Sequence, residues 1–253
     1  MKKYGLLGNK IEYSISPLIH NNHFALFNLD AIYEILDIDD LENNISLIRQ
    51  YSGLNVTKPY KEKILKFCQV LNAEAKEIKA VNCLKIINDK LYGYNTDVYG
   101  FYMLLVKNQL INHKRQVLII GAGGAAKAVY YALKTYTNHD VYITNRTSSK
   151  VNFISSNTID FSLVNNFLTE FDIIINCTSI LDLPIKIDKI KKDAVVIDIN
   201  YQENNLFLQK AQTLNLKTVN GIDMLIYQAA KSFAVWFEKE ANVEVMYDSI
   251  RKG

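Results

Sequence analysis

The sequence has few of the residues that build linkers, disulfide frameworks and membrane spans. Of its 253 residues, three are proline, three are cysteine and one is tryptophan. No apolar run reaches the length that crosses a bilayer, and the opening stretch MKKYGLLGNKIEY is too short in apolar residues for a signal-peptide core. The scarcity of proline argues against long disordered linkers. We therefore expect a soluble, cytoplasmic protein that does not interact with a membrane.

The cysteines and histidines lack the spacing of a metal site. Cys68, Cys83 and Cys177 are odd in number, far apart and without a CxxC pair, which favours a reducing compartment. His20 and His23 lie three residues apart with no third ligand in view. Helix packing and surface polarity are enough to explain them, so we expect no metal.

The charge balance excludes a nucleic-acid partner. There are 29 Lys and Arg against 26 Asp and Glu, giving a formal net charge of +3, and the basic residues are scattered among the acids. A small basic site for an anion stays open. With 49% hydrophobic and 22% charged residues, the chain has the composition of a globular protein and is long enough for two domains.

The order of apolar patterns predicts a two-domain α/β fold. The first hundred residues alternate short extended runs with helical stretches, and Asn88-Asp89 predicts a tight hairpin turn. The run 116–120 then opens a second α/β series, whose strands are apolar on both faces as buried parallel strands must be. We expect one domain of residues 1–100, completed by C-terminal helices returning at 224–253, and a second of residues 101–223.

A dinucleotide-binding turn follows the first strand of the second series. QVLIIGAGGAAKAVYYAL places the pattern GxGxxA between a buried strand and a helix, which is the context that a Rossmann fingerprint requires. Gly121 permits the tight turn, Gly123 lets backbone approach a pyrophosphate, and Ala126 allows close helix packing. The helix N-terminus would receive the phosphates. The candidate cofactor-binding residues of this turn are Gly121, Ala122, Gly123, Gly124 and Ala125.

The end of the next strand favours NADP over NAD. It reads Asn145-Arg146-Thr147, where an NAD-binding protein usually carries an acid. Arg146 would pair with a 2′-phosphate, Asn145 and Thr147 can donate hydrogen bonds, and Lys150 adds positive charge. The alternative is an ordinary polar turn with a surface arginine.

Polar clusters in the first half predict a substrate site. Four of them fall at strand ends or helix starts, and ligands of α/β sheets bind beyond the carboxyl ends of strands. Their hydroxyls, amides, one lysine and one acid suit a polyhydroxylated small molecule with a carboxylate. The clusters are Ser14-Ile15-Ser16-Pro17, Asn55-Val56-Thr57, Ala80-Val81-Asn82 and Asn95-Thr96-Asp97.

Within LNVTKPYKEKI, Lys61 is the strongest candidate for a catalytic group. Pro59 favours a helix start, so we expect a helix over 61–71 with Lys61 in its first turn, where the helix dipole disfavours a cation. A solvated lysine is the alternative, and it is the interpretation we give to Lys63 and Lys66. Asp97 could be a helix N-cap; if it contacts Lys61, it would hold a lysine able to give and take a proton.

Taken together, these blocks resemble the shikimate dehydrogenase family. SISPLIHN matches the family's S-x-S-P-x-x-H-N and LNVTKPYK matches N-V-T-x-P-x-K; AVN, GYNTDVYG, GAGGAAKA, NRT and NGIDMLIYQAA follow in the family's order from Ser14 to Ala230. The resemblance implies an N-terminal substrate domain and a Rossmann-type NADP-binding domain. It also implies reversible NADPH-dependent reduction of 3-dehydroshikimate to shikimate in aromatic amino-acid biosynthesis, by a monomer or homodimer.

The resemblance also implies roles for individual residues. It makes Lys61 and Asp97 the catalytic pair, and Ser14 and Ser16 the groups that hold the substrate carboxylate. Further residues would complete the two sites. Thr57, Asn82, Asp97 and Gln228 would hold ring hydroxyls, Tyr201 would close the pocket, and Thr178 and Gly221 would join the NADP site.

The chain departs from the family pattern on the cofactor side. Residues 177–181, Cys-Thr-Ser-Ile-Leu, lack the glycine of the family's A-T-P-x-G-M, and the proline and threonine expected after Tyr201 are missing. Asp223 adds an acid beside the expected nicotinamide region. Two alternatives stay open: a quinate/shikimate dehydrogenase with relaxed cofactor use, and a non-catalytic metabolite-binding regulator. Retention of Lys61 and Asp97 argues against the regulator.

Overall fold

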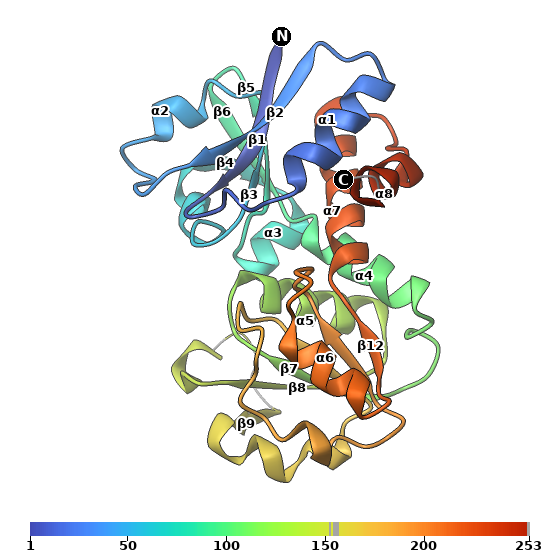
Figure 1. Ribbon diagram of the computed structural model, residues 1–253. Coiled ribbons are helices and arrows are strands. Elements are labelled where there is room, and N and C mark those ends of the chain that lie inside the picture. Colours follow the sequence, from blue (N-terminus) through green and yellow to red (C-terminus); the bar gives the residue numbers. More distant parts are fainter. Residues whose placement is uncertain (152, 154–156, 252–253) are drawn as a thin grey trace. The chain divides into compact units, whose positions relative to one another are not determined.

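The protein divides into two compact units, each with its own six-stranded sheet (Figure 1). The computed structural model describes residues 1–151, 153 and 157–251. Unit 1 comprises Met1–Gly100 and Ile226–Gly253, and unit 2 comprises Phe101–Leu225. The mixed α/β fold class expected from the sequence is confirmed. No helix in the described part of the chain combines the length and the apolar character needed to cross a membrane.

Unit 1 is built on a mostly parallel sheet with the strand order β2-β1-β3-β5-β6-β4. The β1–β2, β1–β3 and β4–β6 pairs are parallel, while β5 runs antiparallel to both β3 and β6. The carboxyl ends of β1, β3 and β6 therefore share one edge of the sheet with the start of β5. The strands are β1 (Lys2–Gly8), β2 (Ala31–Asp37), β3 (Gly53–Val56), β4 (Cys68–Leu71), β5 (Cys83–Ile87) and β6 (Lys90–Tyr94).

The turn between β5 and β6 confirms the predicted hairpin. Asn88 and Asp89 have φ values of 50° and 61°, in the left-handed region that a two-residue hairpin turn needs. Asparagine and aspartate tolerate this region better than other residues with a Cβ. The turn brings β6 back along β5 and so delivers Asn95, Thr96 and Asp97 to the shared edge.

The helices of unit 1 include the C-terminal pair, which packs on the N-terminal part of the chain. Trp236 lies where a Cβ on Gly53 would be, 2.4 Å from the indole Nε1, and that nitrogen donates to the carbonyl of Leu84 at 2.8 Å. A side chain at position 53 would therefore displace the indole. The helices are α1 (Ser16–Leu26), α2 (Ile45–Ile48), α3 (Ala73–Ile78) and α8 (Val243–Arg251), with α4 (Asp97–Lys107) and α7 (Ile222–Phe237) running across the unit boundaries.

The prediction of a helix over residues 61–71 is wrong. Residues Lys63–Phe67 form a short 3₁₀ helix, η1, and Cys68–Leu71 form strand β4. The second half pairs in parallel with β6, matching Cys68 to Leu91 and Leu71 to Gly93. Sheet hydrogen bonds to a strand that already exists outweigh the amphipathic helical pattern, which is a weak signal over so few residues.

Unit 2 has a fully parallel sheet with the order β12-β11-β10-β7-β8-β9. This is the Rossmann order, with the direction of progression reversing between β7 and β10. The strands are β7 (Gln116–Ile120), β8 (Asp140–Asn145), β9 (Thr158–Asp160), β10 (Ile173–Asn176), β11 (Val195–Asp198) and β12 (Lys217–Val219), with helices α5 (Gly124–Tyr136) and α6 (Leu206–Thr213) and the 3₁₀ helices η2 (Ser148–Lys150), η3 (Phe161–Asn166), η4 (Leu168–Glu170) and η5 (Ile187–Lys189).

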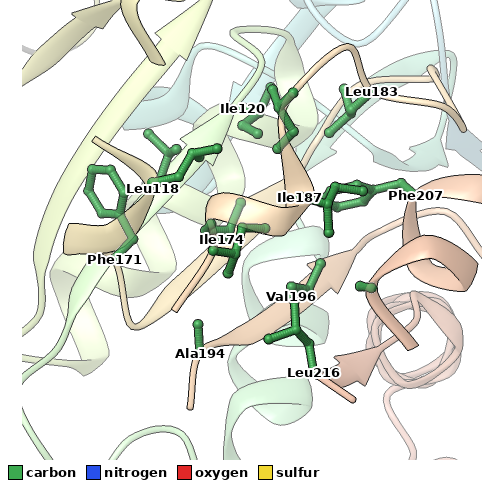
Figure 2. Close-up of a cluster of buried hydrophobic side chains, with 14 of the residues drawn as sticks. Leu118, Ile120, Phe171, Ile174, Leu183, Ile187, Ala194, Val196, Phe207 and Leu216 are labelled. Carbon is green, nitrogen blue, oxygen red and sulfur yellow. The ribbon is translucent and has the colours of Figure 1, made fainter. Parts of the chain in front are cut away.

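The core of unit 2 forms where the apolar runs of the sequence predict it. Leu118, Ile174 and Val196 come from three neighbouring strands and lie in one buried cluster with Phe171 and Phe207 (Figure 2). Strands β10 and β11 are buried at every position. Burial on both faces confirms the parallel, double-sided sheet inferred from these runs.

His20 and His23 are buried side chains of unit 1 and do not contribute to a polar surface. The ring of His20 stacks on Tyr33 with 4.3 Å between centroids, and Nε2 of His23 accepts a hydrogen bond from the backbone of Asn242 at 2.8 Å. Burial lowers the pKa of His20 from 6.5 to about 3 and that of His23 to about 4. Both rings are therefore neutral in the folded protein at neutral pH.

We expect these two histidines to make the protein less stable in mild acid. Below pH 6.5 the unfolded chain binds protons that the folded chain does not, so stability is complete above pH 6.5 and is lost as the pH falls towards about 4. Between pH 7 and pH 5 each histidine should lower the free energy of unfolding by about 2 kcal/mol. His20→Phe keeps an aromatic ring on Tyr33 and should remove about half of this pH dependence.

Urea unfolding at pH 7, 6 and 5 measures the effect. The exposed His113→Gln is the control and should leave the wild-type slope unchanged. Equal slopes in the wild type and in His20→Phe would contradict the prediction.

Candidate active site

One edge of the sheet in unit 1 gathers the polar residues that the sequence separates widely. Ser14 follows β1, Thr57 follows β3, Asn82 precedes β5 and Asp97 follows β6. The backbone N–H of Thr57 donates to the carbonyl of Leu7 at 2.8 Å, which continues the sheet beyond β3. The strand directions therefore bring the four predicted clusters to a common edge.

Lys61 and Asp97 form an ion pair at this edge. Nζ of Lys61 lies 2.5 Å from Oδ2 of Asp97, and the two side chains are 19% and 7% exposed. The other carboxylate oxygen, Oδ1, accepts a hydrogen bond from Nδ2 of Asn82 at 2.7 Å. Both oxygens of Asp97 are thus engaged, which fixes the carboxylate plane. An ammonium has three N–H donors, and Asp97 takes one of them.

The position of Lys61 depends on its backbone and on Asp97, and not on a helix end. The carbonyl of Lys61 accepts from the N–H of Val81 at 2.8 Å, which ties the turn after Pro59 to the segment that leads into β5. Lys61 lies before η1, and a 3₁₀ helix of five residues has little dipole. The dipole argument for an unusual lysine is therefore wrong, while the expected contact with Asp97 is present.

A buried chain of hydrogen bonds holds Asn82 in place. The Oδ1 of Asn82 accepts from the backbone N–H of Thr96 at 2.6 Å, and Oγ1 of Thr96 lies 3.0 Å from Oγ of Ser232. Asn55 donates to Ser232 at 2.8 Å, and the hydroxyl of Tyr33 donates to Asn55 at 2.9 Å. All five side chains are at most 4% exposed. Buried polar networks of this kind rigidify a site when their members are satisfied.

Ser232 was missed by the sequence analysis. It lies on the buried face of α7, one turn after Gln228, and its hydroxyl donates to the carbonyl of Gln228 at 2.9 Å. A serine at a core position of an apolar helix is the signal that could have found it. Gln228 itself is 8% exposed.

The two serines proposed for a carboxylate lie together at the start of α1. Oγ of Ser14 donates to Oγ of Ser16 at 3.1 Å and accepts from the backbone N–H of Ser16 at 3.3 Å. Ser16 is buried and Ser14 is partly exposed. Tyr201 belongs to unit 2, after β11, and is not among the residues that unit 1 brings together.

The GxGxxA turn of unit 2 has the shape of a phosphate cradle. Gly121 has φ +121°, and a Cβ there would lie 3.2 Å from Cγ2 of Thr178 and 3.3 Å from the backbone of Cys177, so glycine is required. A Cβ on Gly123 would meet nothing within 4 Å. Helix α5 starts directly after it, with no side-chain cap and no acid in its first turn. The open space and the uncapped N–H groups fit a bound pyrophosphate.

The basic residues expected at a 2′-phosphate follow β8, which pairs in parallel with β7. Asn145 ends the strand and donates from Nδ2 to the carbonyl of Thr147 at 2.8 Å. Arg146, Thr147 and Lys150 are exposed, and Lys150 closes the 3₁₀ turn η2. This segment therefore presents two cations and no acid beside the GxGxxA turn.

The hydroxyl of Thr178 and the position of Gly221 have structural explanations. Oγ1 of Thr178 donates to Oδ1 of Asn176 at 2.8 Å and accepts from the N–H of Ile180 at 3.1 Å, so it serves the loop itself. A Cβ on Gly221 would come within 1.9 Å of the carbonyl of Ile199, so only glycine allows this close approach.

The acid at position 223 is neutralised. Oδ1 of Asp223 lies 2.9 Å from Nζ of Lys107, and Oδ2 accepts from Nδ2 of Asn108 at 3.4 Å. The negative charge that Asp223 adds is thereby balanced by a cation on α4. As for metals, the residues that the structure describes hold no group of three or more His, Cys, Asp and Glu side chains arranged to bind one.

The fold and these two sets of residues define a two-domain protein of the Rossmann class, with the GxGxxA turn on unit 2 and a lysine–aspartate pair on unit 1. The chain belongs to the shikimate dehydrogenase family. Three family models match it: the shikimate dehydrogenase substrate binding domain over residues 6–84, shikimate / quinate 5-dehydrogenase over 105–204, and the shikimate 5'-dehydrogenase C-terminal domain over 221–251.

Relatives and solved structures agree with the family models. The NADP(+) shikimate dehydrogenase of Methanococcus maripaludis is 37% identical, covering 98% of this chain and 96% of the relative, and that of Staphylococcus haemolyticus is 36% identical, covering 99% and 98%. The crystal structure of the Aquifex aeolicus shikimate dehydrogenase has a TM-score of 0.91 at 32% identity, covering 99% of this chain and 98% of that one. The Thermus thermophilus enzyme, solved with NADP(H) and shikimate, has a TM-score of 0.89 at 27% identity, covering 100% and 99%.

Proposed function

We propose that the protein catalyses the reversible NADPH-dependent reduction of 3-dehydroshikimate to shikimate, a step of aromatic amino-acid biosynthesis. The observation that carries the proposal is the Lys61–Asp97 pair at a sheet edge lined with hydroxyl and amide side chains. It is supported by the NADP(+)-dependent relatives and by the Thermus thermophilus complex with NADP(H) and shikimate.

Lys61 is the general acid and base of the proposed reaction. NADPH, when bound, supplies a hydride to the ketone carbon, so negative charge grows on the ketone oxygen. The ammonium of Lys61 stabilises that charge and donates a proton to the oxygen, and it takes the proton back in the reverse direction. Asp97 remains bonded to Lys61 and Asn82 and keeps the ammonium in one orientation.

The neighbouring residues bind and orient the substrate in this proposal. The hydroxyls of Ser14 and Ser16 lie 3.1 Å apart, close enough to address the two oxygens of one carboxylate. Amides and hydroxyls at the same edge match the ring hydroxyls of a cyclic polyol, and these groups belong to Thr57, Asn82 and Gln228 as well as to the acid Asp97. On the family resemblance, Tyr201 of unit 2 is proposed as a further substrate-binding residue.

Two segments of unit 2 would hold NADP. The turn Gly121, Ala122, Gly123, Gly124 and Ala125, with the first N–H groups of α5, would bind the pyrophosphate. Arg146 and Lys150 would pair with the 2′-phosphate, with Asn145 and Thr147 donating hydrogen bonds. Thr178 would contribute through its backbone and methyl group, because its hydroxyl is used inside its loop. Gly221 would contribute through its backbone, since its lack of a side chain lets the turn after β12 lie against Ile199.

Lys61→Ala should lower kcat by about 100-fold to 10,000-fold with a smaller change in KM, because it removes the proton donor and leaves substrate-binding groups in place. The measurement is NADPH oxidation with 3-dehydroshikimate. Lys63→Ala, which changes an exposed lysine two residues away, is the matched control and should keep wild-type kcat. Turnover by Lys61→Ala at the control's rate would remove Lys61 from the mechanism.

Gly123→Ala and Gly121→Ala should separate cofactor binding from folding. The methyl group of Gly123→Ala enters the open cradle, so Tm should stay at the wild-type value while the Kd for NADPH rises about 10-fold or more. Gly121→Ala forces a side chain into φ +121° and should lower Tm. Fluorescence titration and thermal unfolding measure the two effects; unchanged NADPH affinity in Gly123→Ala would place the pyrophosphate elsewhere.

Arg146→Ala should weaken the binding of NADPH and leave the binding of NADH unchanged. Losing a charge-assisted pair with the 2′-phosphate corresponds to a rise of about 10-fold to 100-fold in the KM for NADPH, and NADH lacks that phosphate. The exposed Lys134→Ala on the same unit serves as the control. If wild-type protein uses NADH as well as NADPH, the assignment of Arg146 fails and relaxed cofactor use takes its place.

A further inference from the structure

The strand order of unit 2 assigns the two halves of a dinucleotide to different loops. In a Rossmann sheet each half of three strands binds one mononucleotide, and the crevice lies where the order reverses, here between β7 and β10. The GxGxxA turn follows β7, and Arg146 follows β8. The other nucleotide, which carries the nicotinamide, therefore faces the loops after β10, β11 and β12.

Asn200 joins these three loops. Its Nδ2 donates to Oδ1 of Asp198 at 2.6 Å and to the carbonyl of Thr178 at 2.8 Å. Its own backbone carbonyl accepts from the N–H of Gly221 at 3.1 Å. Asn200, in the loop after β11, thus forms hydrogen bonds with the loop after β10 and with the turn after β12.

Asp198 anchors Asn200 from within the core. It is fully buried, and its Oδ1 also accepts from the backbone N–H of Asn200 at 2.8 Å. Its Oδ2 accepts from Nδ2 of Asn176 at 2.8 Å. Burial raises the pKa of the Asp198 carboxyl, and the hydrogen bonds from Asn200 and Asn176 oppose that rise by favouring the charged form.

The loop of residues 177–180 contains neither glycine nor proline, the residues that usually set a turn. Hydrogen bonds with the side chains of Asn176 and Asn200 hold its conformation instead. Oδ1 of Asn176 accepts from the backbone N–H and the hydroxyl of Thr178, and its Nδ2 donates to the carbonyl of Ile180 at 2.9 Å. Asn200 holds the carbonyl of Thr178 by a hydrogen bond that comes from the β11 side.

The loop also lies against the end of β7 and the GxGxxA turn. The N–H of Cys177 donates to the carbonyl of Ile120, the last residue of β7, at 2.9 Å. Cγ2 of Thr178 lies 3.2 Å from the point where a Cβ on Gly121 would be. A shift of Thr178 would therefore change the space between the two nucleotide-binding halves.

We propose that Asn200 is a positioning residue that holds residues 177–180 where they orient the nicotinamide end of NADPH for hydride transfer. The inference rests on the proposed function. Affinity for NADPH comes mainly from the pyrophosphate and 2′-phosphate contacts on the other half of the sheet. Loss of Asn200 therefore changes the geometry of the transfer much more than it changes cofactor binding.

The test compares Asn200→Ala with the wild type in full-length protein. A misplacement of about 1 Å can cost about 100-fold in rate, so kcat with 3-dehydroshikimate should fall about 10-fold to 100-fold while the Kd for NADPH changes less than about 3-fold. The isotope effect with NADPH deuterated at the transferred position should rise, because hydride transfer becomes slower. The emission of bound NADPH should move towards that of free NADPH, since the nicotinamide is held less tightly.

Two variants complete the experiment. Asn165→Ala removes another side-chain hydrogen bond of unit 2, from the N–H of Lys186 at 2.7 Å, and should leave kcat, isotope effect and emission at wild-type values. Asn200→Ser keeps a hydrogen-bonding group and should lie between the wild type and Asn200→Ala; it also carries the test if Asn200→Ala does not fold.

The outcomes separate the positioning role from the proposed function. Wild-type kcat and emission in Asn200→Ala, or a loss of kcat matched by an equal rise in the Kd for NADPH, would overturn the role of Asn200. If wild-type protein binds NADPH but does not reduce 3-dehydroshikimate, the proposed function fails and the emission comparison still decides the role of Asn200. Absence of NADPH binding by the wild type would overturn both.

Discussion

The contact between the ammonium of Lys61 and the carboxylate of Asp97 is the interaction on which the candidate site depends. The two residues are 36 positions apart and meet because β3 and β6 run in the same direction, with the antiparallel β5 between them. A partly buried ion pair is stable only when its remaining hydrogen-bonding positions are filled. Asn82 fills one at Asp97, and the chain through Thr96 and Ser232 keeps Asn82 in place.

Features encoded over a few residues were predictable from the sequence. The turn at Gly121 was predictable because GxGxxA stands between a buried strand and a helix, and because its glycine requirement lies in one backbone angle. The Asn88-Asp89 hairpin was predictable because few residue pairs accept two left-handed conformations in succession. The burial of β10 and β11 on both faces was predictable because a run of isoleucine and valine leaves neither face of the strand polar.

Features that depend on distant partners were not predictable. Residues 68–71 read as the end of a helix, and β6, which they join, is formed by residues 90–94. The only local signal of Ser232 is a serine at a core position of an apolar helix, and this signal does not name its partners Asn55 and Thr96, which are more than a hundred residues away. Lys61 was chosen for a helix dipole that the five-residue η1 does not supply, and the reason that holds is its contact with Asp97.

Both units fix a buried aspartate with an asparagine side chain, but they differ in the group that contacts the second carboxylate oxygen. In each, an asparagine amide donates to a buried aspartate and its side-chain oxygen accepts a backbone N–H. Asn82 donates to Asp97 and accepts from Thr96 of another segment, and Asn176 donates to Asp198 and accepts from Thr178, two residues further on. The remaining oxygen of Asp97 contacts Lys61, a group that can exchange a proton. The remaining oxygen of Asp198 accepts from Asn200, whose amide cannot. An aspartate–asparagine pair therefore gives rigidity in both units, and the pair in unit 1 also holds the lysine to which the proposed mechanism assigns proton transfer.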